Sequence, residues 1–169
     1  LAGVPYARAA DADLANGIFL IASPELQDPN FRETVVLITQ PEAGGGQLGV
    51  IVNRPLAARL SDALPDLHTI PDAAQQMYAG GPVAQNRILF LVRARTALAN
   101  SLRVLDEVYL TGDAQLPSRV ARGDLKVESF RAYVGYAGWG QRQLRAEIAA
   151  GGWYMAPADA DIIFTEIGR

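Results

Sequence analysis

Short apolar runs separated by glycine and proline turns are the feature that most restricts how this chain can fold. The runs at 18–22, 35–38 and 88–92 are rich in leucine, isoleucine and valine, a composition and length typical of buried strands. Each run is far shorter than the ~18 residues that an apolar helix needs to cross a bilayer. Turns such as Asn53-Arg54-Pro55 and Gly80-Gly81-Pro82 end the segments. The pattern predicts about eight short strands, with a hairpin formed by 34–39 and 48–52.

Few segments have a helical pattern. Leu144 and Ile148 form an i,i+4 apolar pair within 141–150, which Gly151 can end. Shorter helices are predicted at 60–64, at 114–122 after Asp113, and at 160–164. Strands come early in the chain and helices late, which favours an α+β fold over a regular doubly wound sheet.

The segment 130–136 alternates as a strand does. Phe130, Ala132, Val134 and Tyr136 are expected on one face, with the residues between them on the other. A glycine-rich stretch, Gly135–Gly140, then follows and is expected to turn the chain out of the strand and into the next helix.

The length of 169 residues indicates a single domain. Residues 1–16 have no periodicity, so we expect a flexible N-terminal extension followed by one domain at 17–169. The first residues end in Ala7-Arg8-Ala9, which resembles the end of a signal peptide. The alternative is an alanine-rich arm without a targeting role. We therefore expect a cytoplasmic protein, or a periplasmic one if residues 1–9 are the end of a signal peptide.

The composition excludes several kinds of site. The chain has no cysteine and one histidine, His68, so disulfides, thiolate chemistry and zinc sites built from cysteines or several histidines are excluded. We expect no metal and no cofactor. The net charge is −3, with the arginines scattered among acids, which argues against direct nucleic-acid binding.

A catalytic serine is the one enzymatic alternative in the sequence. Ser23 follows a strand, and His68 is the only base of the usual kind, so a small hydrolase would have to use these two residues. Ser23 does not lie in a G-x-S-x-G motif. A turn serine and a surface histidine are the simpler interpretation, and we expect a protein that is not an enzyme.

A candidate binding groove can be drawn from the turn residues. It combines the Asn53-Arg54 turn, where the arginine can hold a carboxylate or phosphate, with a glycine turn and an aromatic segment. The candidate residues are Asn53, Arg54, Gly80, Gly81, Tyr136, Gly138 and Trp139. Each also has a structural interpretation: tight turns for the glycines, backbone partners for Asn53, an acid partner for Arg54, and a place in the core for Trp139.

Taken together, the turns resemble those of the bacterial YqgE/AlgH family. The motifs that carry the resemblance are Ala22-Ser23-Pro24 with Asp28-Pro29, Leu48–Pro55, Gly80–Val83, Val134–Leu144, and Trp153 with Ala156–Asp159. The resemblance implies one domain with a bifurcated sheet wrapped into a pseudo-barrel, mainly antiparallel or mixed, with a few short flanking helices.

The family is often labelled a transcriptional regulator, but it brings no established activity, cofactor or catalytic residue. We therefore expect a non-enzymatic binding or regulatory protein, whose partner is an unknown protein or small molecule. A direct DNA-binding regulator and the Ser23–His68 hydrolase are the alternatives.

Overall fold

A long strand, β9 (Ser129–Trp139), joins the two halves of the sheet. The computed structural model describes residues 17–41, 46–64, 67 and 70–165. The other strands of this part are β1 (Ile18–Ala22), β2 (Val35–Pro41), β3 (Gln47–Ile51), β4 (Pro55–Arg59), β5 (Gln76–Ala79), β6 (Val83–Arg93), β7 (Leu102–Leu105), β8 (Val108–Thr111) and β10 (Trp153–Pro157). The helices are α1 (Leu60–Ala63), α2 (Asp72–Gln75), α3 (Leu116–Ala121), α4 (Gln143–Ala149) and α5 (Ala160–Phe164).

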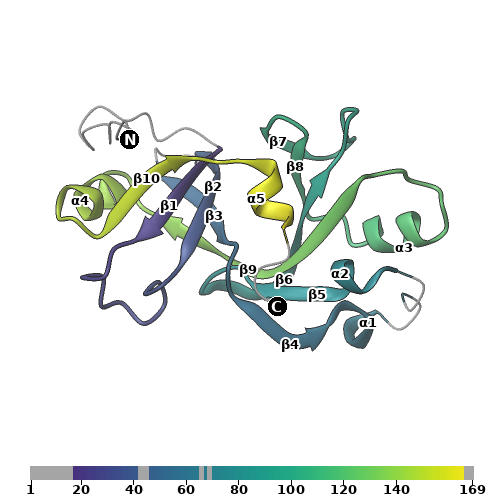
Figure 1. Ribbon diagram of the computed structural model, residues 1–169, viewed down its shortest axis with the longest axis horizontal. Helices are drawn as coiled ribbons and strands as arrows, with labels where there is room; N and C mark the ends of the chain where they lie inside the picture. The colour runs from purple at the N-terminus through teal and green to yellow at the C-terminus, as the bar shows by residue number, and fades with distance from the viewer. Residues whose placement is uncertain (1–16, 42–45, 65–66, 68–69, 166–169) are drawn as a thin grey trace, which may run out of the picture.

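The described strands form one ten-stranded sheet that divides along β9. Its main order is β10-β1-β2-β3-β9-β6-β8-β7. On one edge of β9, β3 pairs with its end, where Gly49 faces Ala137, and β5 runs parallel to its middle, where Met77 faces Ala132. Two strands thus share one edge of β9, and the sheet divides there into two wings. One wing is β10-β1-β2-β3 and the other is β6-β8-β7, and β4 and β5 lie below them (Figure 1). The predicted α+β fold with a mainly antiparallel, bifurcated sheet is confirmed.

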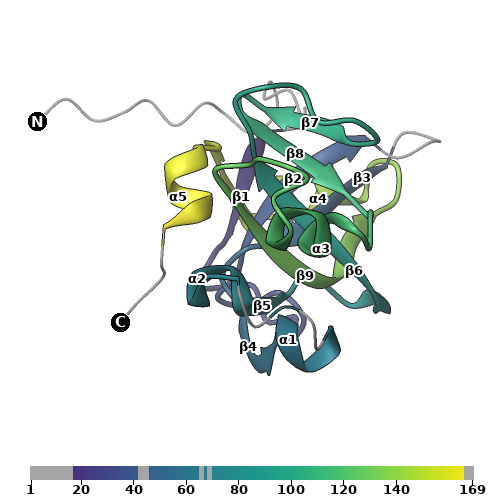
Figure 2. The same ribbon diagram turned by 90° about the vertical axis from the view of Figure 1, so that its right-hand side faces the viewer.

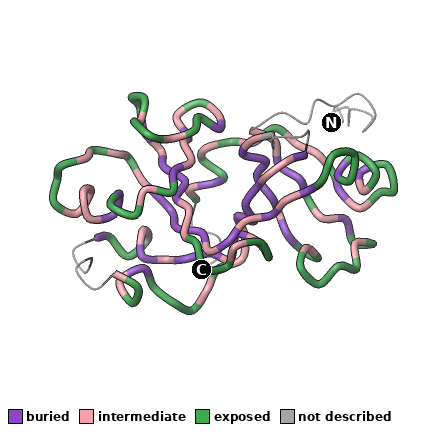
Figure 3. The backbone as a smooth tube through the Cα atoms, turned by 180° about the vertical axis from the view of Figure 1, so that it is seen from behind, coloured by how far each residue is buried: buried purple, intermediate pink, exposed green. Residues whose placement is uncertain are grey.

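Three apolar clusters hold the wings and their helices together. The first lies between the β1–β2–β3 wing and α4, and includes Trp139, Leu144 and Ile148. The second lies between the wings and contains Ile163 of α5, and α5 is seen between the wings in Figure 1. The third packs the β6 wing against the α1–α3 side of the molecule, and Figure 2 shows these helices from that side. Buried segments follow the strands, and exposed segments follow the loops and outer helical faces (Figure 3).

A glycine in the middle of β9 changes which residues face the interior. Phe130, Ala132 and Val134 pack in the third cluster, as their alternation predicts. Tyr136 does not join them, and packs instead with Tyr133 in the second cluster. Gly135 has a φ of +71°, and the register between β6 and β9 shifts at this point, so the alternation inverts. The prediction that Tyr136 shares the face of Phe130 is therefore wrong, and the strand continues to Trp139 where an exit was expected.

Other elements differ from the predictions near proline and at their ends. Pro55 was expected to stop a strand, but it begins β4, an edge strand paired only with β5, where a missing N–H is tolerated. The helices predicted at 114–122 and 141–150 are present but shorter, while α5 has the predicted bounds. Among the described residues, no helix is long and apolar enough to cross a membrane. The extension predicted for residues 1–16 lies outside the described residues.

Candidate functional site

The Asn53-Arg54 turn binds backbone groups of the preceding loop. Asn53 Oδ1 accepts a hydrogen bond from the Val35 amide at 2.8 Å, and Nδ2 donates to the Glu33 carbonyl at 3.0 Å. The Arg54 guanidinium donates to the carbonyls of residues 30, 32 and 29 at 2.5, 3.1 and 3.3 Å. Both side chains thus tie the loop at 29–33 to the end of β3. The backbone partners expected for Asn53 are present, whereas Arg54 binds carbonyl oxygens where an acid partner was expected.

Gly80 and Gly81 lie where the β5–β6 connection crosses β9. A Cβ atom on Gly80 would come within 2.3 Å of the Gly135 carbonyl oxygen, and one on Gly81 within 2.2 Å of the Tyr136 backbone. The same restriction holds at Gly135, where an added Cβ would lie 2.5 Å from the Gly81 carbonyl oxygen. Side chains are therefore excluded on both sides of the crossing, and these glycines allow the close approach of two backbones.

Trp139 is a core residue. Only 2% of its surface is exposed, and its ring stacks on Phe31 at 5.6 Å between ring centroids. Its indole N–H donates to Glu147 Oε2 at 3.1 Å. The neighbouring Gly138 pairs with Leu48 across the sheet, and a Cβ there would meet the Leu48 side chain at 3.4 Å. The structural interpretation of Trp139 is confirmed by its burial.

Ser23 has no base beside it among the described residues. It is 2% exposed, and its hydroxyl group has no hydrogen-bond partner in the described part of the chain. His68, the other member of the hydrolase hypothesis, lies outside the described residues.

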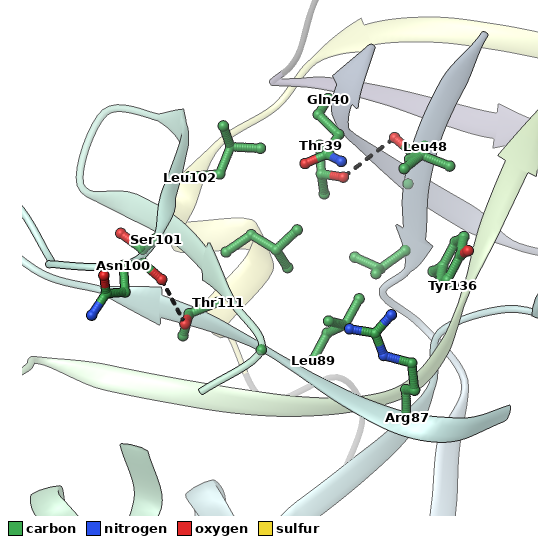
Figure 4. Close-up of a pocket in the computed structure, with 14 residues that line it drawn as sticks. Thr39, Gln40, Leu48, Arg87, Leu89, Asn100, Ser101, Leu102, Thr111 and Tyr136 are labelled. Atoms are coloured by element: carbon green, nitrogen blue, oxygen red, sulfur yellow. Dashed lines mark hydrogen bonds between the residues drawn. The ribbon is translucent and has the colours of Figure 1, made fainter. Parts of the chain in front are cut away.

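A cavity lies between the two wings (Figure 4). Its volume is about 410 Å³. β2 and β3 supply Thr39, Gln40, Leu48, Gly49 and Val50, while the other wing supplies Arg87, Leu89, Asn100, Ser101, Leu102, Leu110, Thr111 and Gly112, and β9 supplies Tyr136. Tyr136 is the one residue of the sequence-based candidate groove that lines this cavity. The inversion at Gly135 turns Tyr136 toward this interior.

The threonine and serine hydroxyl groups of the cavity are hydrogen-bonded to backbone carbonyls. Thr39 Oγ1 donates to the Leu48 carbonyl at 3.3 Å, and Thr111 Oγ1 donates to the Asn100 carbonyl at 3.1 Å, as Figure 4 shows. Ser101 Oγ likewise donates to the Leu98 carbonyl at 2.6 Å. The Arg87 guanidinium extends toward the cavity from β6 (Figure 4) and forms no ion pair or hydrogen bond with a described residue.

The sequence analysis did not predict this cavity, although the sequence indicates one part of its lining. Arg87, Leu89 and Leu91 are two residues apart, so the alternation of a strand places the three on one face. The predicted strand began only at Ile88, so Arg87 was left outside it. The remaining lining residues come from distant segments that only the curvature of the sheet brings together.

Comparisons with known proteins agree on one family over almost the whole chain. A model of an AlgH-like family matches residues 19–168. A UPF0301 protein of Methylococcus capsulatus is 37% identical over 159 residues, which cover 92% of this chain and 84% of that protein. A UPF0301 protein of Chlorobium chlorochromatii is 36% identical over 154 residues, covering 90% of this chain and 80% of that protein.

Two solved structures have a similar fold. The solution structure of the AlgH protein from Pseudomonas aeruginosa has a TM-score of 0.72 and 31% sequence identity, and the match covers 90% of this chain and 83% of that one. The crystal structure of protein DIP2367 from Corynebacterium diphtheriae has a TM-score of 0.75 at 24% identity, covering 89% and 79% of the two chains. At that identity the second structure shows the shared fold alone.

Proposed function

Since the chain belongs to the AlgH-like family of uncharacterised proteins, we propose a function from its own geometry: it is a non-enzymatic binding protein that takes a small ligand into the cavity between the two wings. This ligand site replaces the groove drawn from the turn residues, because Arg54 and Trp139 already have partners in the chain. Tyr136 belongs to both.

The cavity itself is the observation that carries the proposal. Its volume of about 410 Å³ falls within the ~300–1,000 Å³ typical of small-molecule sites. Such sites are mostly apolar and have a few polar groups that orient the ligand. Leu48, Val50, Leu89 and Leu110 provide the apolar walls here, and Arg87 provides a charged group. Because the two walls belong to different wings, a ligand would also bridge the halves of the sheet.

The hydroxyl groups and potential metal ligands of the described residues support binding over catalysis. Ser23 is buried with no described partner, and it does not line the cavity. No group of three or more His, Cys, Asp or Glu side chains in the described part of the chain could hold a metal ion. The hydroxyl groups of Thr39, Ser101 and Thr111 in the cavity wall each donate a proton to a backbone carbonyl, and no His, Asp or Glu is among the described residues that line the cavity.

The arrangement of charge supports a small ligand over DNA. The described ion pairs engage Arg59, Arg93, Arg95, Arg103, Arg119 and Arg122 with neighbouring carboxylates. Pairing reduces the positive charge that a nucleic-acid surface would need, and the whole chain has a net charge of −3.

A fragment screen followed by nuclear magnetic resonance (NMR) tests the proposal. Ligands should shift the backbone amide signals of Gly49 and Gly112, which line the cavity, and leave those of Gly123 and Gly151, which do not. Leu102→Trp should block the cavity from β7, and Tyr154→Trp at an exposed position of β10 is the matched control. The cavity is rejected as the ligand site if hits bind the Leu102→Trp variant as well as they bind the parent protein. It is also rejected if no hit shifts the amide signals of Gly49 and Gly112.

A further inference from the structure

We propose that the ligand of this cavity is a small amphiphilic anion, a carboxylate or phosphate monoester with an apolar body, whose anionic group binds the Arg87 guanidinium. This inference rests on the function proposed above and adds the chemical class of the ligand. Three observations support it: an arginine without a carboxylate partner in the described part of the chain, a set of described lining residues without carboxylates, and an apolar wall beside that arginine.

The first observation is a contrast within one strand. The face of β6 that contains Leu89 and Leu91 has Arg87, which is exposed, at one end and Arg93, which is half-buried, at the other. Arg93 donates to Asp161 at 2.7 Å and to Glu107 at 3.4 Å, and these carboxylates raise the pKa of Arg93 above its usual value. Arg87 has no carboxylate partner among the described residues. The fold compensates one end of this face and leaves the other end for an external anion.

The second observation is the sign of the charge around the cavity. Among the described residues that line the cavity, Arg87 is the only charged side chain, and none is an aspartate or glutamate. The guanidinium group has five N–H donors in a fixed plane, a geometry that matches carboxylate and phosphate oxygens in pairs. Gln40 adds an amide group to the lining that can also donate. A cationic ligand would be repelled by Arg87 and would find no carboxylate among the described lining residues.

The third observation is the wall beside Arg87. In Figure 4, the Arg87 guanidinium lies near Leu89 and the ring of Tyr136. The apolar wall continues through Leu48, Val50 and Leu110. The hydroxyl protons of Thr39, Ser101 and Thr111 are already donated to backbone carbonyls, so these groups offer few donors to a polyhydroxylated ligand. An apolar body can therefore remove this surface from water while its anionic end stays at Arg87.

An NMR titration with three related ligands tests the inference. The probes are octanoate, octyl phosphate and 1-octanol, which have eight carbon atoms each and differ in the end group; the alkyl chain of octanoate is shorter by one methylene group, which contributes about 0.8 kcal/mol, or about four-fold in affinity, when buried. We expect both anions to shift the amide signals of Gly49 and Gly112. The affinity for 1-octanol should be lower by about ten-fold or more, because a charged hydrogen-bonded contact contributes on the order of a ten-fold change in affinity. The ratio of octanoate to octyl phosphate affinity identifies the preferred anionic group.

Arg87→Gln isolates the contribution of the guanidinium. The variant should weaken octanoate and octyl phosphate by about ten-fold and leave 1-octanol unchanged. Arg145→Gln, at an exposed arginine of α4 away from the cavity, should change none of the three affinities. Equal binding of 1-octanol and octanoate, or an Arg87→Gln variant that still binds the anions normally, would overturn the anion assignment while leaving the cavity as the ligand site.

Two further outcomes separate this inference from the proposed function. If none of the three probes binds, but fragments of other chemistry shift Gly49 and Gly112, the ligand class is wrong and the binding function stands. If the anions bind but shift the amide signals of Gly123 or Gly151, and Leu102→Trp does not change their affinity, both the ligand class and the cavity are rejected.

Discussion

The indole groups of Trp139 and Trp153 donate hydrogen bonds to the same carboxylate oxygen, Glu147 Oε2, at 3.1 and 2.9 Å. The two rings meet edge to face, with centroids 6.0 Å apart, and Phe31 contacts both. Glu147 lies on α4, whereas the tryptophans lie on β9 and β10. One carboxylate therefore fixes the helix over the first apolar cluster and pairs two buried N–H groups.

Removing this carboxylate should destabilise the protein. Glu147→Ala leaves both indole donors without a partner, and each unpaired buried donor costs about 1–3 kcal/mol, so we expect a loss of about 2–6 kcal/mol in the free energy of unfolding. Glu147→Gln keeps one acceptor oxygen and should lose less. Urea denaturation measures both, with Arg145→Ala on the same helix as the control. The shared-acceptor interpretation is wrong if Glu147→Ala is as stable as that control.

Trp139 itself should be among the most costly side chains to truncate. Its ring is 2% exposed, so Trp139→Ala removes buried apolar surface and leaves a cavity, with an expected cost of about 3–5 kcal/mol. Tyr154→Ala, at a position 49% exposed on β10, is a control for loss of an aromatic ring. Thermal and urea unfolding of the two variants compare them directly. Similar stability would place Trp139 at the surface.

The backbone crossing at Gly135 predicts a difference between two glycines with similar dihedral angles. Gly135 and Gly123 have φ values of +71° and +79°. A Cβ at Gly135 would collide with the carbonyl oxygens of Gly81 and Val83, at 2.5 and 2.8 Å, whereas a Cβ at Gly123 has nothing within 4 Å.

Gly123→Ala should therefore lose only the cost of the left-handed backbone, about 1–2 kcal/mol. Gly135→Ala should lose substantially more, or fail to fold, because the colliding atoms are backbone. Circular dichroism with urea titration compares the two. Equal losses of stability would mean that the β5–β6 connection and β9 can separate at the crossing without cost.

The sequence was sufficient where local pattern decides the structure. The β2–β3 hairpin, the helix around Leu144 and Ile148, and the core position of Trp139 follow from periodicity and turn residues. The inward turn of Tyr136 did not, because strand alternation gives no warning of the positive φ at Gly135. The cavity could not be predicted either: Leu48 and Leu110 meet across it only because β9 joins two diverging wings.

Arg54 is another residue whose role depends on contacts distant in sequence. Its guanidinium binds three carbonyl groups of the loop at 29–32, so Arg54→Ala should free this loop. We expect a loss of about 1–3 kcal/mol and faster hydrogen exchange of the Arg32 and Thr34 amides, which are bonded within the loop. Arg54→Lys should restore only part of the protection, because an ammonium group lacks the planar fork.

Octanoate binding distinguishes the two roles that Arg54 has been given. If Arg54 only ties the loop, Arg54→Ala should bind octanoate as the parent protein does, in contrast to Arg87→Gln. Loss of octanoate binding in a folded Arg54→Ala variant, with Arg87→Gln unaffected, would instead place the anion at the Asn53-Arg54 turn.

Tyr133 makes stability sensitive to alkaline pH. The residue is fully buried between the wings and stacks on Tyr78 with centroids 5.4 Å apart. Its hydroxyl group has no hydrogen-bond partner among the described residues. Burial raises the pKa of the Tyr133 phenol well above its usual value, and although the nearby Arg131 guanidinium acts in the opposite direction, burial prevails.

The native state therefore keeps the Tyr133 proton after the unfolded chain has lost it. Stability from this group is complete below the unfolded pKa of about 10 and falls as the pH rises above it, by up to about 1.4 kcal/mol per pH unit. Tyr133→Phe should remove this part of the slope, and at neutral pH it should be neutral or slightly stabilising, because it deletes an unpaired buried hydroxyl group. Urea unfolding from neutral to strongly alkaline pH measures the slope, and Tyr154→Phe, at an exposed tyrosine, should keep the parent value. A Tyr133→Phe variant with the parent slope would mean that the phenol meets water or a hydrogen-bond partner in the native state.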